Sequence, residues 1–121
     1  MHVMVANNAY PPIAALTRAG HLLLPSLWYE NAPVAVVEAA AYGLGVIASD
    51  IGAIPEFVEP GATGTLVRPG DAAALAEAMR RLAADPGALP NLAVRSRAFA
   101  DRFTVDRMID GYLDCYAAVS R

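Results

Sequence analysis

Residues 21–52 read HLLLPSLWYENAPVAVVEAAAYGLGVIASDIG, and this stretch decides the fold. Two apolar runs, HLLL at 21–24 and VIAS at 46–49, are too short for helices and predict buried strands. The proline before 34–42 suits the first turn of a helix, and Gly43 can end that helix in the left-handed conformation. We therefore expect a strand, a helix and a second, parallel strand.

The same alternation continues outward on both sides of this stretch. Further elements are predicted as strands at 2–5 and 65–67 and as helices over 10–18 and near 55–58. A helix over 72–84 is predicted with Asp71 as its cap and with Glu77 and Arg81 paired four residues apart, and two helices are predicted within 89–120 with Thr104 capping the second. The pattern predicts an α/β fold, a Rossmann-like parallel sheet with helices on both faces. Ligands of such sheets bind at the carboxyl ends of the strands, so the loops after Leu24, Ser49 and Val67 should line the site.

Composition excludes several classes of function. The 121 residues carry a net charge of −3 without a basic cluster, which argues against a nucleic-acid partner. All nine basic residues are arginine, so a lysine Schiff base within this chain is excluded. The lone Cys115, which we expect in the core, permits no intrachain disulfide. With no targeting or membrane-spanning segment recognisable, we expect one soluble, cytoplasmic domain over residues 1–121.

Two glutamates mark the candidate site. Glu38 is the single charged residue in the otherwise apolar segment PVAVVEAAAY, which indicates a helix buried all round and a carboxylate that is either hydrogen-bonded or paired with an arginine. Glu30 lies eight residues earlier, just before the helix begins. The first free amides of that helix, on Val34 to Val36, would face an anion, for which a diphosphate is the obvious candidate.

The segment 25–71 resembles the donor-binding half of the retaining glycosyltransferases of family 4 (group 1), which have the two-domain glycosyltransferase B-type fold. The resemblance rests on Glu30 and Glu38 with seven residues between them, a Val-Ile-Ala-Ser strand, Asp50, Gly52, Pro55-Glu56, and a turn with Gly61 and Gly64. The match is close over this segment and looser in the flanking helices.

The resemblance assigns roles to five residues. It implies that Glu38 accepts hydrogen bonds from the ribose hydroxyls of a nucleotide diphosphate sugar and that Glu30 holds hydroxyls of the transferred sugar. Asn31, Val34 and Ala35 complete the expected substrate-binding set, with the helix amino end steadying the diphosphate. The implied reaction is sugar transfer to an unknown acceptor with retained configuration, without metal or other cofactor, and with no residue assigned as catalytic.

The chain also departs from the family pattern. Asn31-Ala32-Pro33 stands where many relatives have Gly-Phe-Gly, which removes one amide, and Ala53 stands where a second glycine usually follows Gly52. The family's amino-terminal acceptor domain and its basic pair precede the segment that matches. We therefore expect a fragment of the donor domain that is inactive by itself.

Other readings remain open. The alternative is a non-catalytic, truncated donor-domain module that only folds or associates; a sugar-nucleotide epimerase is a third possibility. Trp28 and Tyr29 fit either stacking on a ligand or packing under the loop, while His2 and His21 are too isolated for a metal site. The apolar stripe of the helix over 104–120 has no evident partner within the chain and predicts a homo-oligomer or a helix-exchanged dimer.

Overall fold

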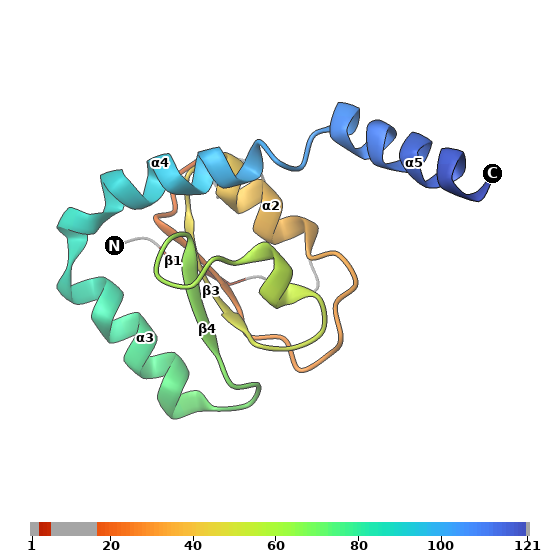
Figure 1. Ribbon diagram of the computed structural model, residues 1–121. Helices are drawn as coiled ribbons and strands as arrows, with labels where there is room; N and C mark the ends of the chain where they lie inside the picture. Colours follow the sequence, from red (N-terminus) through yellow and green to blue (C-terminus); the bar gives the residue numbers. More distant parts are fainter. Residues whose placement is uncertain (1–2, 6–16, 121) are drawn as a thin grey trace.

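The computed structural model describes residues 3–5 and 17–120. Within these residues, four parallel strands form one sheet in the order β1-β2-β3-β4 (Figure 1). The strands are β1 (Val3–Val5), β2 (His21–Leu24), β3 (Gly45–Ser49) and β4 (Gly64–Val67). In the register, Leu23 is paired with Ile47, and Ile47 with Thr65. The predicted strands are confirmed, with β3 and β4 each beginning one residue earlier than expected.

The helices cover both faces of the sheet. They are α2 (Val34–Ala41), the 3₁₀ turn η1 (Ile54–Phe57), α3 (Ala72–Ala84), the 3₁₀ turn η2 (Pro86–Ala88), α4 (Leu89–Ala100) and α5 (Val105–Val119). α3 lies on one side of the strands, and α2 on the other with α4 packed against it (Figure 1). This confirms the α/β class with helices on both faces.

The two faces of the sheet build two separate parts of the core. On the α2 face, Leu22 and Val46 pack with Val36 and Ile54. On the α3 face, Leu23 and Ile47 pack with Val67 and Ala78. Successive residues of β2 and β3 thus point to opposite faces, and both strands are buried throughout. Burial on both faces explains why these strands read as continuous apolar runs.

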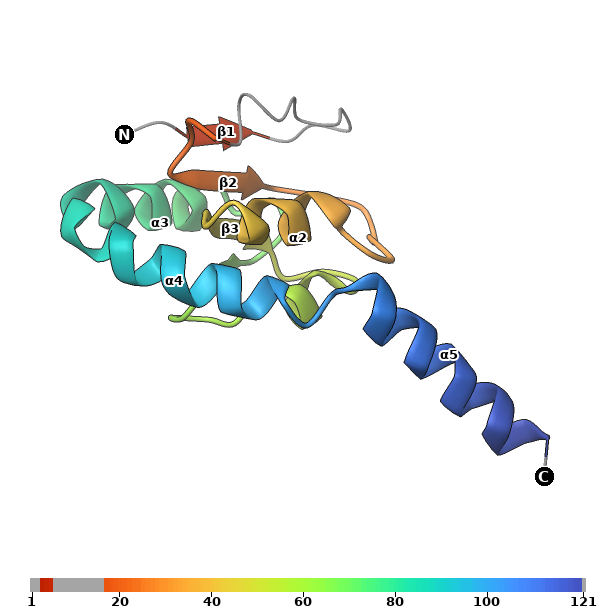
Figure 2. The ribbon, with the colours of Figure 1, turned by 90° about the horizontal axis from the view of Figure 1, so that it is seen from above.

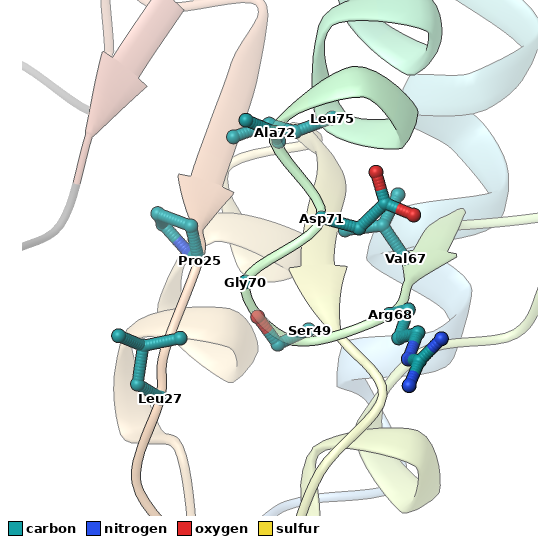
Figure 3. A pocket seen from close by; sticks show the side chains of 9 residues that line it. All are labelled: Pro25, Leu27, Ser49, Val67, Arg68, Gly70, Asp71, Ala72 and Leu75. Atoms are coloured by element: carbon teal, nitrogen blue, oxygen red, sulfur yellow. The ribbon is translucent and has the colours of Figure 1, made fainter.

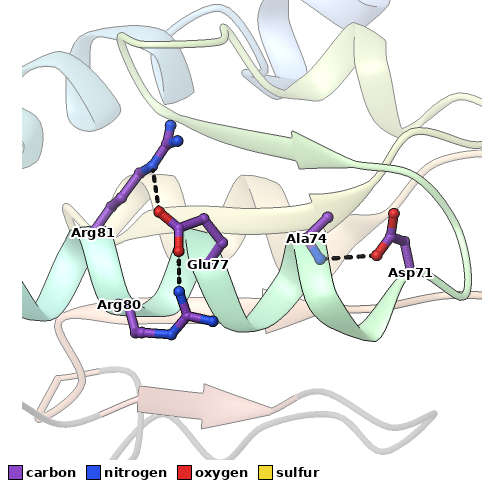
Figure 4. Close-up of polar contacts among 5 residues, drawn as sticks. All are labelled: Asp71, Ala74, Glu77, Arg80 and Arg81. Carbon is purple, nitrogen blue, oxygen red and sulfur yellow. Dashed lines mark hydrogen bonds and ion pairs between the residues drawn. The ribbon is translucent and has the colours of Figure 1, made fainter.

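The local start and stop signals act as the sequence predicts. The Asp71 carboxylate accepts the Ala74 N–H at 2.8 Å, and Glu77 binds both Arg80 and Arg81 along α3 (Figure 4). Thr104 caps α5 in the same way, because its hydroxyl accepts the Arg107 N–H at 3.3 Å. Each of these contacts joins residues three or four apart on one helix, and such contacts are readable from sequence.

Two expectations about burial are wrong. α2 is not buried all round, because Val34 is 47% exposed, and its buried residues are Val36, Ala39 and Ala40. Cys115 is exposed rather than in the core. Cys115 is exposed because α5 extends away from the body (Figures 1 and 2) and has no buried residue.

Parts of the amino-terminal prediction lie outside the described residues. These are the helix expected over 10–18, except for the turn at Thr17 and Arg18, and His2. Among the helices that the structure describes, none has the length and apolar content needed to cross a bilayer.

Candidate functional site

The carboxyl ends of β2, β3 and β4 meet at a pocket of roughly 170 Å³ (Figure 3). Its lining comes from the segment after β2, from the end of β3, and from the turn between β4 and α3: Pro25, Leu27, Ser49, Val67, Arg68, Gly70, Asp71, Ala72 and Leu75. The loops predicted after Leu24 and Val67 do line this pocket, whereas β3 contributes its last residue, Ser49, and the loop after it contributes none of the lining residues.

Glu30 is half-buried and held by both its side chain and its main chain. Ser26 Oγ donates a hydrogen bond to Glu30 Oε1 at 3.1 Å, and the Ala53 N–H donates to the Glu30 carbonyl oxygen at 2.9 Å. The second bond ties the β2–α2 loop to the loop after β3. Glu30 Oε2 makes no hydrogen bond within the described residues and is available as an acceptor.

Glu38 lies in the second turn of α2 and is also half-buried. Among the ion pairs formed by the described residues, none includes Glu38, and its carboxylate accepts no hydrogen bond there. The arginine pair that the sequence left open is therefore not formed within this part of the chain. A partly exposed carboxylate with free acceptor sites can receive two hydroxyl donors at once.

The amino end of α2 offers fewer free amides than predicted. The Val34 N–H is bonded to the Ala32 carbonyl oxygen and the Val36 N–H to the Pro33 carbonyl oxygen, both at 2.8 Å. The expectation that the amides of residues 34–36 are all free is thus wrong, because the Ala32-Pro33 turn supplies acceptors for two of them. The Ala35 N–H has no partner of this kind among the described residues and remains available.

The loop before α2 is strongly exposed. Trp28 and Tyr29 are 71% and 83% exposed, so the idea that they pack under the loop is wrong. Asn31 is exposed as well. None of the five residues assigned to the substrate from sequence lines the pocket, whereas Arg68, which the sequence included only as part of the loop after Val67, does. Its position directly after β4 was the available signal.

The described residues contain no cluster of three or more metal-ligating His, Cys, Asp or Glu side chains. His21 is 2% exposed at the amino end of β2, opposite the edge that carries the pocket. Neither of its ring nitrogens has a hydrogen-bond partner among residues 3–5 and 17–120, and burial lowers the pKa of the imidazole. His21 is therefore a residue of the packed interior rather than of the site.

The family profile described as "Glycosyl transferases group 1" matches residues 2–85. The chain belongs to this family. It is 35% identical over 104 residues to the D-inositol 3-phosphate glycosyltransferase of Streptomyces bingchenggensis, a match that covers 86% of this chain and 23% of the relative. It is 40% identical over 94 residues to the glycogen synthase of Mycobacterium tuberculosis, covering 78% of this chain and 22% of the relative. The chain spans about a quarter of the length of the curated relatives it matches.

Solved glycosyltransferase structures share the fold. The chain superposes on Anabaena HepE in complex with UDP with a TM-score of 0.78 and 25% identity, over 85% of this chain and 29% of HepE. It superposes on the sucrose-phosphate synthase of Thermosynechococcus elongatus with a TM-score of 0.74 and 35% identity, over 88% of this chain and 28% of that protein. A second HepE structure holds both UDP and glucose.

Proposed function

We propose that this group 1 glycosyltransferase chain is the donor-binding part of a retaining enzyme and binds a nucleotide diphosphate sugar around the amino end of α2. The observation that carries the proposal is the pair Glu30 and Glu38, two half-buried carboxylates with free acceptor oxygens on the loop–helix unit that follows β2. The complexes of the similar protein HepE with UDP and with UDP and glucose support this choice of ligand.

Each residue of the proposed site has a physical task. Glu38 accepts hydrogen bonds from the two ribose hydroxyls, and Glu30 accepts hydroxyls of the transferred sugar through Oε2. The Ala35 N–H donates to the diphosphate at the helix amino end, where partial positive charge also favours an anion. That stabilisation grows as the glycosidic bond breaks and charge collects on the leaving diphosphate. Exposed Asn31 adds an amide donor beside it.

The chain alone is expected to bind donor without transferring it. The relatives are about four times as long, and the family resemblance places acceptor binding in the part of the enzyme outside the matched segment. The alternative, a non-catalytic module, predicts folding without nucleotide binding. The proposal assigns a donor site to the described residues and an acceptor role to none of them.

The test is calorimetric titration of the chain with UDP, GDP and ADP and with the corresponding glucose diphosphates. The proposal expects saturable binding of one nucleotide and a change in affinity when the sugar is present. Absence of binding by all six compounds at millimolar concentration would favour the non-catalytic module. Turnover that depends on Glu30, measured with simple acceptors, would show that the chain is catalytically complete.

We also propose that the apolar stripe of α5 packs against a second polypeptide. The stripe consists of Val105, Met108, Ile109, Tyr112, Leu113, Tyr116 and Val119, all between 46% and 81% exposed. For the isolated chain, that polypeptide is another copy of itself. α5 extends away from the rest of the described chain and has no buried residue, which is the arrangement this proposal needs (Figure 2).

A further inference from the structure

Three phenylalanines meet where α4 ends and α5 is about to begin. Phe103 stacks on Phe57 of η1 with ring centroids 5.2 Å apart, and Phe99 packs at a tilt against Phe103 at the same separation. Phe99 is 3% exposed and Phe103 is 41% exposed. This phenylalanine cluster (Phe57, Phe99 and Phe103) joins η1 to a segment that is distant in the sequence.

A polar contact holds the same junction. Arg102 Nη1 donates to Glu59 Oε1 at 2.6 Å, and the Arg102 guanidinium lies over the Phe99 ring at 5.0 Å. Both charged side chains are about half exposed, so the ion pair adds little stability by itself. The ion pair does join the segment after η1 to the end of α4, as the aromatic contact also does.

The other end of η1 carries the donor-site loop. Ile54, the first residue of η1, is completely buried, and Ala53, just before it, donates its N–H to the Glu30 carbonyl oxygen. η1 is a single turn of four residues. One end of this short, anchored turn therefore contacts Phe103, and the other end holds the main chain of Glu30.

We propose that the phenylalanine cluster is a positioning device for Glu30. Packing of Phe103 on Phe57 sets the tilt of η1, and η1 sets the place of the Glu30 main chain and thus of its carboxylate. Phe57 and Phe103 are positioning residues that touch no ligand. The inference rests on the proposed contact between Glu30 and the donor sugar.

The cluster also links α5 to the donor site. Phe103 lies two residues before α5, and α5 has no buried residue that would anchor it to the body elsewhere. Any partner that seats α5 therefore acts on the contact between Phe103 and Phe57. Such a partner would adjust the Glu30 carboxylate through η1 without reaching the site itself.

The first test measures amide hydrogen exchange by NMR on the full chain without ligand. We expect Phe103→Ala to speed exchange of the Ala53 amide several-fold while the Ile47 amide in the centre of β3 stays protected. Phe103→Leu should restore part of the protection, and Asp110→Asn, on α5 but outside its apolar stripe, should change nothing. Unchanged exchange at Ala53 in Phe103→Ala, with the fold intact, overturns the proposal.

A milder variant covers the case in which Phe103→Ala destabilises the whole domain and Ile47 exchanges faster as well. Phe103→Leu removes the ring stacked on Phe57 and keeps an apolar side chain in its place. A selective rise in exchange at Ala53 in Phe103→Leu then supports the positioning role. Equal exchange at Ala53 in Phe103→Leu and the unchanged protein counts against it.

The second test separates this inference from the proposed function. UDP and UDP-glucose are titrated into the chain and the ratio of their Kd values is compared. Phe103→Ala should move the ratio toward that of Glu30→Gln while the Kd of UDP stays the same. If Glu30→Gln changes the ratio of Kd values and Phe103→Ala does not, the positioning role is wrong. If Glu30→Gln leaves the ratio unchanged, the proposed contact between Glu30 and the sugar is wrong. In that case the exchange rate of the Ala53 amide still tests the positioning role.

Discussion

Gly52 lies against the main chain of Glu30, and a Cβ atom at position 52 would stand 2.8 Å from the Glu30 nitrogen and 2.9 Å from its carbonyl oxygen. Gly52 also has a φ of 59°, in the left-handed region that favours glycine. Glycine at position 52 thus allows two loops of the protein to approach each other closely. This contact explains the glycine without a ligand.

Replacing Gly52 with alanine should lower the free energy of unfolding by about 2–4 kcal/mol, since strain in φ and the backbone clash add together. Gly61→Ala is the matched control, because Gly61 has a φ of 77° and a Cβ atom there would meet none of the described residues within 4 Å. It should cost only about 1 kcal/mol. Urea unfolding of both variants checks this, and equal losses would show that the clash is relieved without cost.

Glu38→Gln should weaken nucleotide binding by about 1–3 kcal/mol, because one charged acceptor for the ribose hydroxyls becomes a neutral amide. The loss should be the same for a nucleotide with and without its sugar. Glu77→Gln on α3 is the control, because Glu77 pairs with Arg80 and Arg81 on its own helix. Calorimetry is the measurement. If Glu38→Gln and the unchanged chain bind the nucleotide with equal affinity, Glu38 does not contact the ribose.

The stability of the chain should depend on pH through His21. Burial lowers the pKa of His21 below 6.5, so below that pH the unfolded chain binds a proton that the folded chain does not. Stability from this residue is therefore fully present above about pH 6.5 and declines as the pH falls toward the folded-state pKa. Urea unfolding between pH 7.5 and 5.5 measures the decline. His21→Leu should flatten it, and an equal slope in that variant would assign the effect to other groups.

Sequence reasoning worked where a structure depends on neighbours along the chain. Asp71 and Thr104 cap their helices through bonds to residues three positions ahead, and Gly43 ends α2 with a φ of 78°. The strands were recognisable because burial on both faces requires apolar residues throughout. The position of the pocket at the carboxyl ends of β2, β3 and β4 followed from strand direction alone, although none of the five residues assigned to the substrate lines it.

The errors concern features that depend on tertiary contacts or on turn geometry. The amides of Val34 and Val36 are engaged because of the exact course of the Ala32-Pro33 turn, which the letters do not specify. Exposure of Trp28 depends on what packs over its loop. For Cys115, periodicity showed that α5 has an apolar side, but periodicity cannot show whether any partner covers it.

The last prediction concerns that apolar side of α5. Burying one large apolar side chain contributes about 1.5–3 kcal/mol, so several members of the stripe together can offset the entropy lost on association. Light scattering should therefore find a dimer of the chain at tens of micromolar. Tyr112→Ser combined with Tyr116→Ser should shift it to monomer, since these two rings stack side by side on the stripe, 6.4 Å apart. Asp110→Asn, on the opposite side of the helix, is the control and should remain dimeric. A stable monomer of the unchanged chain at that concentration would mean that α5 is reserved for a different polypeptide.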